Sequence, residues 1–271
     1  MRKFSFILIF LLVSHFSNAA TVDTITVYSN SMNKNIKAVV VLPAAYSTRV
    51  HFPAVYLLHG YSGDFSNWIK KVPSLQQLAD NNKIIIVCPD GAYSSWYFDS
   101  PIDSSYRYET FITKELIHYI DSNYQTISNR KARAITGLSM GGHGGLFLGI
   151  RHQDVFGACG SMSGGVDLLS SVGKFDIAKR IGDTTRYLQN WKDLSVINQI
   201  EKTKTDSLSV IFDCGTEDFF YETNKSLHQK MLQLKIKHDY IERPGKHDWN
   251  YWANSVKYQI LFFEEYFNKG K

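Results

Sequence analysis

Residues Gly137-Leu138-Ser139-Met140-Gly141 have the residue types and spacing of a serine nucleophile site. A short strand-like run, 132–136, precedes them, and a helix-like segment, 140–151, follows. This arrangement is typical of a nucleophile elbow, a sharp strand-to-helix turn that raises a serine hydroxyl above the end of a sheet. Glycine is needed on either side because a Cβ would clash in so tight a turn. The sequence therefore predicts that Ser139 attacks a carbonyl carbon.

A serine hydroxyl is a weak nucleophile unless a base removes its proton and a third group orients that base. The acidic group of such a site follows a strand, because ligands bind beyond the carboxyl ends of parallel strands. Glu217 and Asp218 both follow the predicted strand 208–214. Asp218 is the favoured acid and Glu217 the competitor, whereas Asp213 lies inside the strand and is expected in the core.

His247 is the predicted base. The expected chain order of the three groups is serine, acid and then histidine. Of the nine histidines, only His247 both follows the acid and lies in a loop beyond a predicted strand, 239–242. A lone loop histidine is usually solvated, but its order and position favour catalysis. The other histidines are assigned surface or capping roles or, at position 15, leave with the N-terminal segment; they are His15, His51, His59, His118, His143, His152, His228 and His238.

The negative charge that develops on a carbonyl oxygen requires two backbone N–H donors. One belongs to Met140, the residue after the nucleophile. The second is expected from the loop 59–63, which follows the predicted strand 54–58. Gly60 allows a close backbone approach there. His59 is interpreted as shaping this loop rather than as a catalytic group.

Strands that alternate with helices must position these loops, and they predict a mostly parallel sheet with helices on both faces. The strand-rich beginning adds antiparallel edge strands. Expected strands cover 22–28, 36–42, 54–58, 84–88, 132–136, 156–162, 208–214 and 239–242; expected helices cover 110–122, 140–151, 219–234 and 249–267. Residues 163–207 exceed an ordinary connection, and a partial lid and a peripheral insertion are equally open interpretations.

The first twenty residues have the pattern of a secretory signal peptide. Arg2 and Lys3 precede an apolar run that is too short for a membrane span, and small residues lie near Ala19 and Ala20. We expect an exported protein, periplasmic or extracellular, with one domain over 21–271. Loss of Arg2 and Lys3, with no acidic residue, lowers the formal net charge from +5 to +3. With no basic run, nucleic-acid binding is not expected. Stable membrane insertion is not expected either, because no later segment is long and apolar enough to span a bilayer.

Three cysteines, Cys88, Cys159 and Cys214, lie in apolar, strand-like runs. An odd number leaves at least one thiol free, and buried free thiols are favoured over a disulfide. Their spacing fits no zinc site, so no metal ion and no cofactor are expected. The oligomeric state stays open.

Four motifs in this order resemble the esterase D / antigen 85 superfamily. They are Tyr56-Leu57-Leu58-His59-Gly60-Tyr61, Gly137-Leu138-Ser139-Met140-Gly141-Gly142, Cys214-Gly215-Thr216-Glu217-Asp218-Phe219 and Gly245-Lys246-His247-Asp248-Trp249. The resemblance extends from about Thr24 to Phe267 and implies an α/β-hydrolase fold. It implies a triad of Ser139, Asp218 and His247, because Asp218 matches the second acid of the motif. It also implies that the amides of Tyr61 and Met140 form the oxyanion hole.

The loop 92–108 is rich in aromatic residues and opens toward the expected active face. Trp96 and Tyr97, together with His59, are candidates for lining the substrate pocket; packing of the domain is the alternative for the aromatic rings. The favoured hypothesis is a secreted serine esterase that removes acetyl or feruloyl groups from carbohydrate esters, small or polymeric. A tributyrin-type esterase, an acyltransferase to a sugar and a non-catalytic carbohydrate-binding module are the alternatives.

Overall fold

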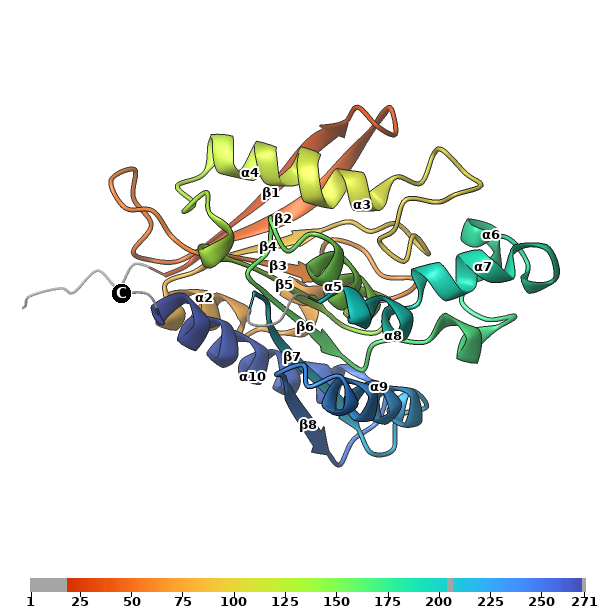
Figure 1. The fold of residues 1–271 in the computed structure, drawn as a ribbon. Helices are drawn as coiled ribbons and strands as arrows, with labels where there is room; N and C mark the ends of the chain where they lie inside the picture. The colour runs from red at the N-terminus through yellow and green to blue at the C-terminus, as the bar shows by residue number, and fades with distance from the viewer. Residues whose placement is uncertain (1–18, 204–206, 270–271) are drawn as a thin grey trace, which may run out of the picture.

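A computed structural model describes residues 19–203 and 207–269. The predicted signal peptide, 1–20, lies outside the described residues except for Ala19 and Ala20. One eight-stranded sheet runs through the domain in the order β1-β2-β4-β3-β5-β6-β7-β8 (Figure 1). The strands are β1 (Thr21–Ser29), β2 (Lys34–Leu42), β3 (Ala54–Leu58), β4 (Ile85–Pro89), β5 (Arg133–Gly137), β6 (Ala158–Met162), β7 (Ser209–Gly215) and β8 (Asp239–Arg243).

Strand β2 is antiparallel to both β1 and β4, whereas the remaining neighbours are parallel. The mostly parallel sheet with antiparallel strands at its beginning is therefore confirmed. All residues of β3, β4, β5 and β6 are buried. Their burial follows from this position, because helices cover both faces of a central parallel strand.

The helices form two layers around the sheet (Figure 1). Helices α1 (Asn67–Lys71), α2 (Leu75–Asn82) and α10 (Trp249–Asn268) pack with one set of strand side chains, which includes Val55 and Ala134. The opposite core contains alternate strand residues such as Tyr56 and Ile135, and it is covered by helices α4 (Ile117–Asn123), α5 (Met140–Arg151) and α9 (Tyr221–Gln233). This alternation is the period of two expected for a strand buried on both sides.

Most predicted boundaries lie within one or two residues of the observed ones, and two of the differences have a specific local cause. The helix expected over 110–122 extends from α3 (Tyr108–Thr110) through the π-helical segment η1 (Phe111–Leu116) into α4. The strand expected from Phe156 begins at Ala158, because the N–H of Phe156 bonds to the carbonyl of His152 in the preceding turn. Helices α1 and α2 were not predicted, since their short sequences have little apolar periodicity.

The segment 163–207 contains the helices α6 (Ile177–Ile181), α7 (Thr184–Leu194) and α8 (Val196–Gln199). It also contains the 3₁₀ turns η3 (Leu168–Ser171) and η4 (Ile200–Lys202), whereas the 3₁₀ turn η2 (Arg130–Ala132) precedes β5. Its helices α6 and α7 lie at one side of the domain, beyond the sheet (Figure 1). Within 19–203 and 207–269, no helix has the length and apolar character required to cross a bilayer. Cys88, Cys159 and Cys214 are buried and free, as favoured.

Candidate active site

Ser139 occupies a strained turn between β5 and α5. Its backbone has φ 55° and ψ −115°, a conformation that a residue with a Cβ rarely adopts. A Cβ on Gly137 would lie 2.6 Å from the carbonyl oxygens of Leu58 and Gly141. The Ser139 N–H donates to the carbonyl of Met162 at 2.9 Å, which ties the turn to β6. The two glycines and this bond allow the turn to hold its strained residue.

Ser139, His247 and Asp218 form a continuous hydrogen-bonded chain. The Nε2 atom of His247 lies 2.9 Å from Oγ of Ser139, and its Nδ1 atom lies 2.8 Å from Oδ2 of Asp218. An ionised carboxylate only accepts hydrogen bonds, so Nδ1 carries the imidazole proton and Nε2 accepts from the serine hydroxyl. The structure thus brings together the three side chains that the sequence placed far apart.

Asp218 is held by the turn that follows β7. Its Oδ1 atom accepts a hydrogen bond from the Phe220 N–H at 2.8 Å, and its side chain is fully buried. Glu217, the competing acid, has a side chain that is 57% exposed and lies 3.8 Å from Nζ of Lys246. Only Asp218 therefore faces His247.

The loop that carries His247 joins β8 to α10 and is bonded to the Asp218 loop. The N–H groups of Thr216 and Glu217 donate to the carbonyls of Arg243 and Gly245 at 2.9 and 3.0 Å. Asp248 then caps α10, because its carboxylate accepts from the Tyr251 N–H at 3.0 Å. These local bonds extend the parallel pairing of β7 and β8 and bring the two loops together.

Two backbone N–H groups are available beside the serine. Among the described residues, neither the N–H of Tyr61 nor that of Met140 has a hydrogen-bond acceptor. A Cβ on Gly60 would lie 3.3 Å from the Cβ of Ser139, so the loop approaches the elbow as closely as expected. The two donors have the residue positions required of an oxyanion hole.

His59 fixes the backbone of this loop from beneath. Its Nε2 atom accepts from the Gly91 N–H at 2.7 Å, and its Nδ1 atom therefore donates to the carbonyl of Gly60 at 2.8 Å. Burial lowers the pKa of His59, which keeps the imidazole neutral for this bonding pattern. The loop-shaping interpretation of His59 agrees with these contacts.

A cavity of about 330 Å³ opens beside Ser139 and His247. Aromatic rings form much of its wall, with small or polar groups near the oxyanion loop. Its lining residues are Gly60, Tyr61, Ser62, Gly63, Asn67, Leu138, Ser139, Phe175, Phe219, His247, Trp249 and Trp252.

His59, Trp96 and Tyr97 do not line this cavity, so their prediction as pocket residues is wrong. All three are at least 99% buried. The Tyr97 hydroxyl donates to the carbonyl of His59 at 3.1 Å, and the Trp96 indole N–H donates to the carbonyl of Phe175 at 3.1 Å. The rings of Trp96 and Tyr97 belong to the hydrophobic core, and the backbone at both residues is left-handed (φ 55° and 60°).

The actual aromatic lining was missed in part for lack of a local signal. Phe219 directly follows the predicted acid and Trp249 lies two residues after the predicted base, so their positions in the sequence could have indicated that they line the site. Phe175 lies in the segment 163–207 and shows no pattern that points to the site. Trp252 follows one helical turn after Asp248, the cap of α10.

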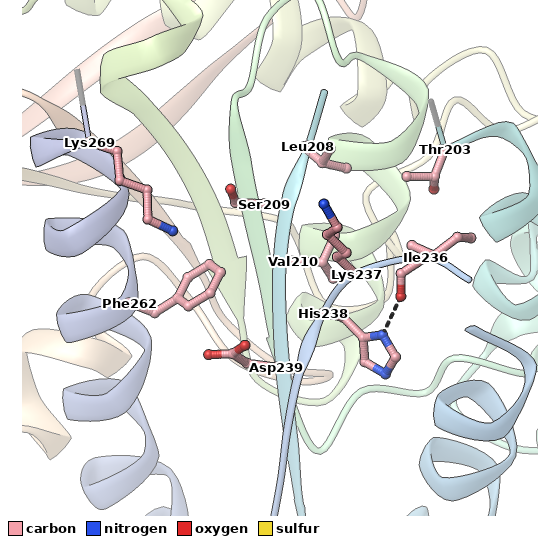
Figure 2. A pocket seen from close by; sticks show the side chains of 10 residues that line it. All are labelled: Thr203, Leu208, Ser209, Val210, Ile236, Lys237, His238, Asp239, Phe262 and Lys269. Carbon is pink, nitrogen blue, oxygen red and sulfur yellow. Dashed lines mark hydrogen bonds between the residues drawn. The ribbon is translucent and has the colours of Figure 1, made fainter. Parts of the chain in front are cut away.

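A second cavity, of about 220 Å³, lies at the opposite ends of β7 and β8 (Figure 2). Ser209 and Asp239, the first residues of these strands, line it, whereas the Asp218 and His247 loops follow the last residues. His238 also lines it and donates from Nδ1 to the carbonyl of Ile236 at 2.7 Å. This cavity is thus separate from the serine site. Within 19–203 and 207–269, no three His, Cys, Asp or Glu side chains are grouped as metal ligands.

Comparisons with known proteins agree with this geometry. The model of the family described as "Putative esterase" matches residues 29–262. An acetyl esterase of Caldicellulosiruptor saccharolyticus is 24% identical over 86% of this chain and 94% of its own length. The diacylglycerol acyltransferase/mycolyltransferase Ag85A of Mycobacterium gordonae is 28% identical over 87% of this chain and 78% of its own length.

A solved structure of a ferulic acid esterase superposes with a TM-score of 0.79 and 28% identity, over 93% of this chain and all of the other. The predicted α/β-hydrolase fold and the resemblance to the esterase D / antigen 85 superfamily are thereby confirmed.

Proposed function

Because this chain belongs to that esterase family and is a serine carboxylic-ester hydrolase, we propose that it cleaves acetyl or feruloyl esters of carbohydrates through Ser139, His247 and Asp218. The observation that carries the residue assignment is the chain of 2.9 and 2.8 Å hydrogen bonds from the serine hydroxyl to the carboxylate.

In the proposed mechanism, Nε2 of His247 takes the hydroxyl proton as Ser139 attacks the ester carbonyl carbon. Asp218 keeps the imidazole proton on Nδ1 and stabilises the imidazolium that forms. The N–H groups of Tyr61 and Met140 donate to the oxyanion of the tetrahedral intermediate. His247 returns the proton to the departing alcohol oxygen, and water then repeats the sequence on the acyl-enzyme.

The proposed ester class draws on relatives and on the cavity. The acetyl esterase and the ferulic acid esterase named above support these two acyl groups. An aromatic-walled cavity of about 330 Å³ is compatible with a ring as well as with an acetyl group. The N-terminal pattern supports export of a mature domain, 21–271, to the periplasm or outside the cell, where polymer-bound esters occur.

The assignment is tested by replacing Ser139 with Ala. We expect kcat for phenyl acetate to fall by on the order of 10⁶, and covalent labelling by a fluorophosphonate probe to disappear. The matched control is Ser170→Ala, at an exposed serine whose hydroxyl donates to the Asp167 carbonyl. We expect this variant to retain the wild-type kcat and the fluorophosphonate labelling. Turnover of the Ser139 variant within tenfold of wild type contradicts the assignment.

The ester class is tested separately with acetylated xylan, feruloylated arabinoxylan and tributyrin. Release of acetate or ferulate supports the proposal, whereas activity confined to tributyrin contradicts it. A sugar acceptor is added in parallel reactions, because one relative is named as an acyltransferase. Accumulation of acylated sugar at the expense of free acid would identify a transferase.

A further inference from the structure

Segment 163–207 contacts the catalytic cavity through a single lining residue, Phe175, among those described. Along the chain, Phe175 lies between η3 and α6. Helices α6 and α7 of the same segment lie at one side of the domain, beyond the sheet (Figure 1). Its side chain is half-buried, so one part of the ring packs and another part stays open to the cavity.

The backbone that carries Phe175 is strained and firmly held. Phe175 and Asp176 both have left-handed φ values, 54° and 55°, which are unfavourable for residues with a Cβ. The Trp96 indole N–H donates a hydrogen bond to the Phe175 carbonyl oxygen, with 3.1 Å between Nε1 and the oxygen. Strain that neighbours maintain in this way is concentrated at functional sites.

The Phe175 ring packs near the oxyanion loop and near the loop that follows β7. Its centroid lies 5.6 Å from that of Tyr61 in the oxyanion loop and 6.1 Å from that of Phe219, to which it is nearly parallel at 18°. Phe219 in turn lies 4.2 Å from the ring of His247 and is 62% exposed. An exposed phenyl ring beside the proposed general base thus forms part of the wall of the cavity that Ser139 also lines.

We propose that Phe175 and Phe219 form an aromatic clamp that makes the enzyme select esters bearing a planar aromatic ring, on either the acyl or the alcohol side. This inference rests on the proposed esterase function. Rings stack favourably at centroid separations of about 4.5–7 Å, so a substrate ring against these two side chains gains contacts. An acetyl group on an alkyl alcohol has no ring to place there and gains none of them.

The test compares kcat/KM ratios in wild type and Phe175→Ala. Ethyl ferulate against ethyl acetate reports on the acyl side, and phenyl acetate against ethyl acetate reports on the alcohol side. We expect the ratio for the clamped side to fall about tenfold, which corresponds to about 1.4 kcal/mol. Phe175→Tyr keeps the ring and restores that ratio to within about twofold. Leu188→Ala, an exposed residue of α7 in the same segment, is the matched control.

Binding to the Ser139→Ala protein gives a second readout that does not need turnover. Titration calorimetry with ethyl ferulate and phenyl acetate should show that adding Phe175→Ala weakens Kd about tenfold for the clamped ester. Unchanged ratios and unchanged Kd values overturn the proposal, as does an equal loss for all three esters, which indicates only a structural role. Fluorophosphonate labelling of Ser139 tests the esterase function alone, so the two failures are distinguishable.

Discussion

Replacement of Asp218 by Asn tests the most specific consequence of the site geometry. The two carboxylate oxygens have different partners: Oδ1 accepts from the Phe220 N–H at 2.8 Å, and Oδ2 accepts from Nδ1 of His247 at 2.8 Å. An asparagine has one acceptor and one donor end. The Phe220 N–H requires the acceptor, so the amide NH₂ must face His247.

That orientation reverses the tautomer of the base. With an N–H donor opposite, Nδ1 of His247 becomes the acceptor and the ring proton moves to Nε2, which then has no lone pair for the Ser139 hydroxyl 2.9 Å away. The comparable substitution in another serine triad lowers kcat by about 10⁴. We expect a similar fall here, about 5.5 kcal/mol of transition-state stabilisation.

The assay is kcat for phenyl acetate at neutral pH, with the melting temperature measured in parallel. Asn is isosteric with Asp and keeps the Phe220 bond, so we expect little change in stability. Glu217→Gln is the matched control, and we expect activity within about twofold, because its exposed pair with Lys246 contributes little. A kcat for Asp218→Asn within tenfold of wild type, or an equal loss in Glu217→Gln, would refute the tautomer argument.

Three further predictions concern the framework of the site. Gly141→Ala places a Cβ 2.5 Å from the carbonyl oxygens of Leu58 and His59; we expect urea unfolding to show a loss of about 2–3 kcal/mol, and wild-type stability would mean that the elbow is less rigid than described. Burial opposes ionisation of Glu109, but hydrogen bonds from His152 and Arg151 outweigh it and lower the carboxyl pKa. The ionised Glu109 carboxylate therefore stabilises the folded protein above the unfolded-state pKa of 4.5, and this stabilisation is lost as the pH falls through the lower folded pKa. Glu109→Gln should cost about 1–3 kcal/mol at pH 7 and progressively less as the pH falls below about 4, whereas a pH-independent difference in unfolding experiments contradicts this. Burial also raises the pKa of the thiols of Cys88, Cys159 and Cys214, so Ellman's reagent should label none in the native protein and all three in urea; rapid native labelling would show that a thiol is accessible.

Much of the framework was predictable because it depends on local sequence. Strands β3 and β4 are runs of almost entirely apolar residues, and the elbow between β5 and α5 requires glycine at fixed offsets from the serine. Two of the differences, at the π-helical segment η1 and at the start of β6, depend on hydrogen bonds that the residue pattern does not specify. Helices α1 and α2 form mainly by packing against the sheet and α10, which local periodicity does not reveal.

The amino-acid sequence by itself determined the chemical groups and their order along the chain: a serine in a glycine-bracketed turn, an acid after one strand and a histidine after the next. Only the tertiary structure decided the directions in which neighbouring side chains point. Pairing of β7 with β8 and the Phe220 N–H direct Asp218, rather than Glu217, at His247. Trp96 is buried in the core, where its indole N–H bonds to the carbonyl of Phe175, a residue of the cavity wall. Residue type and spacing are local, whereas the direction of a side chain depends on contacts with segments remote in the chain.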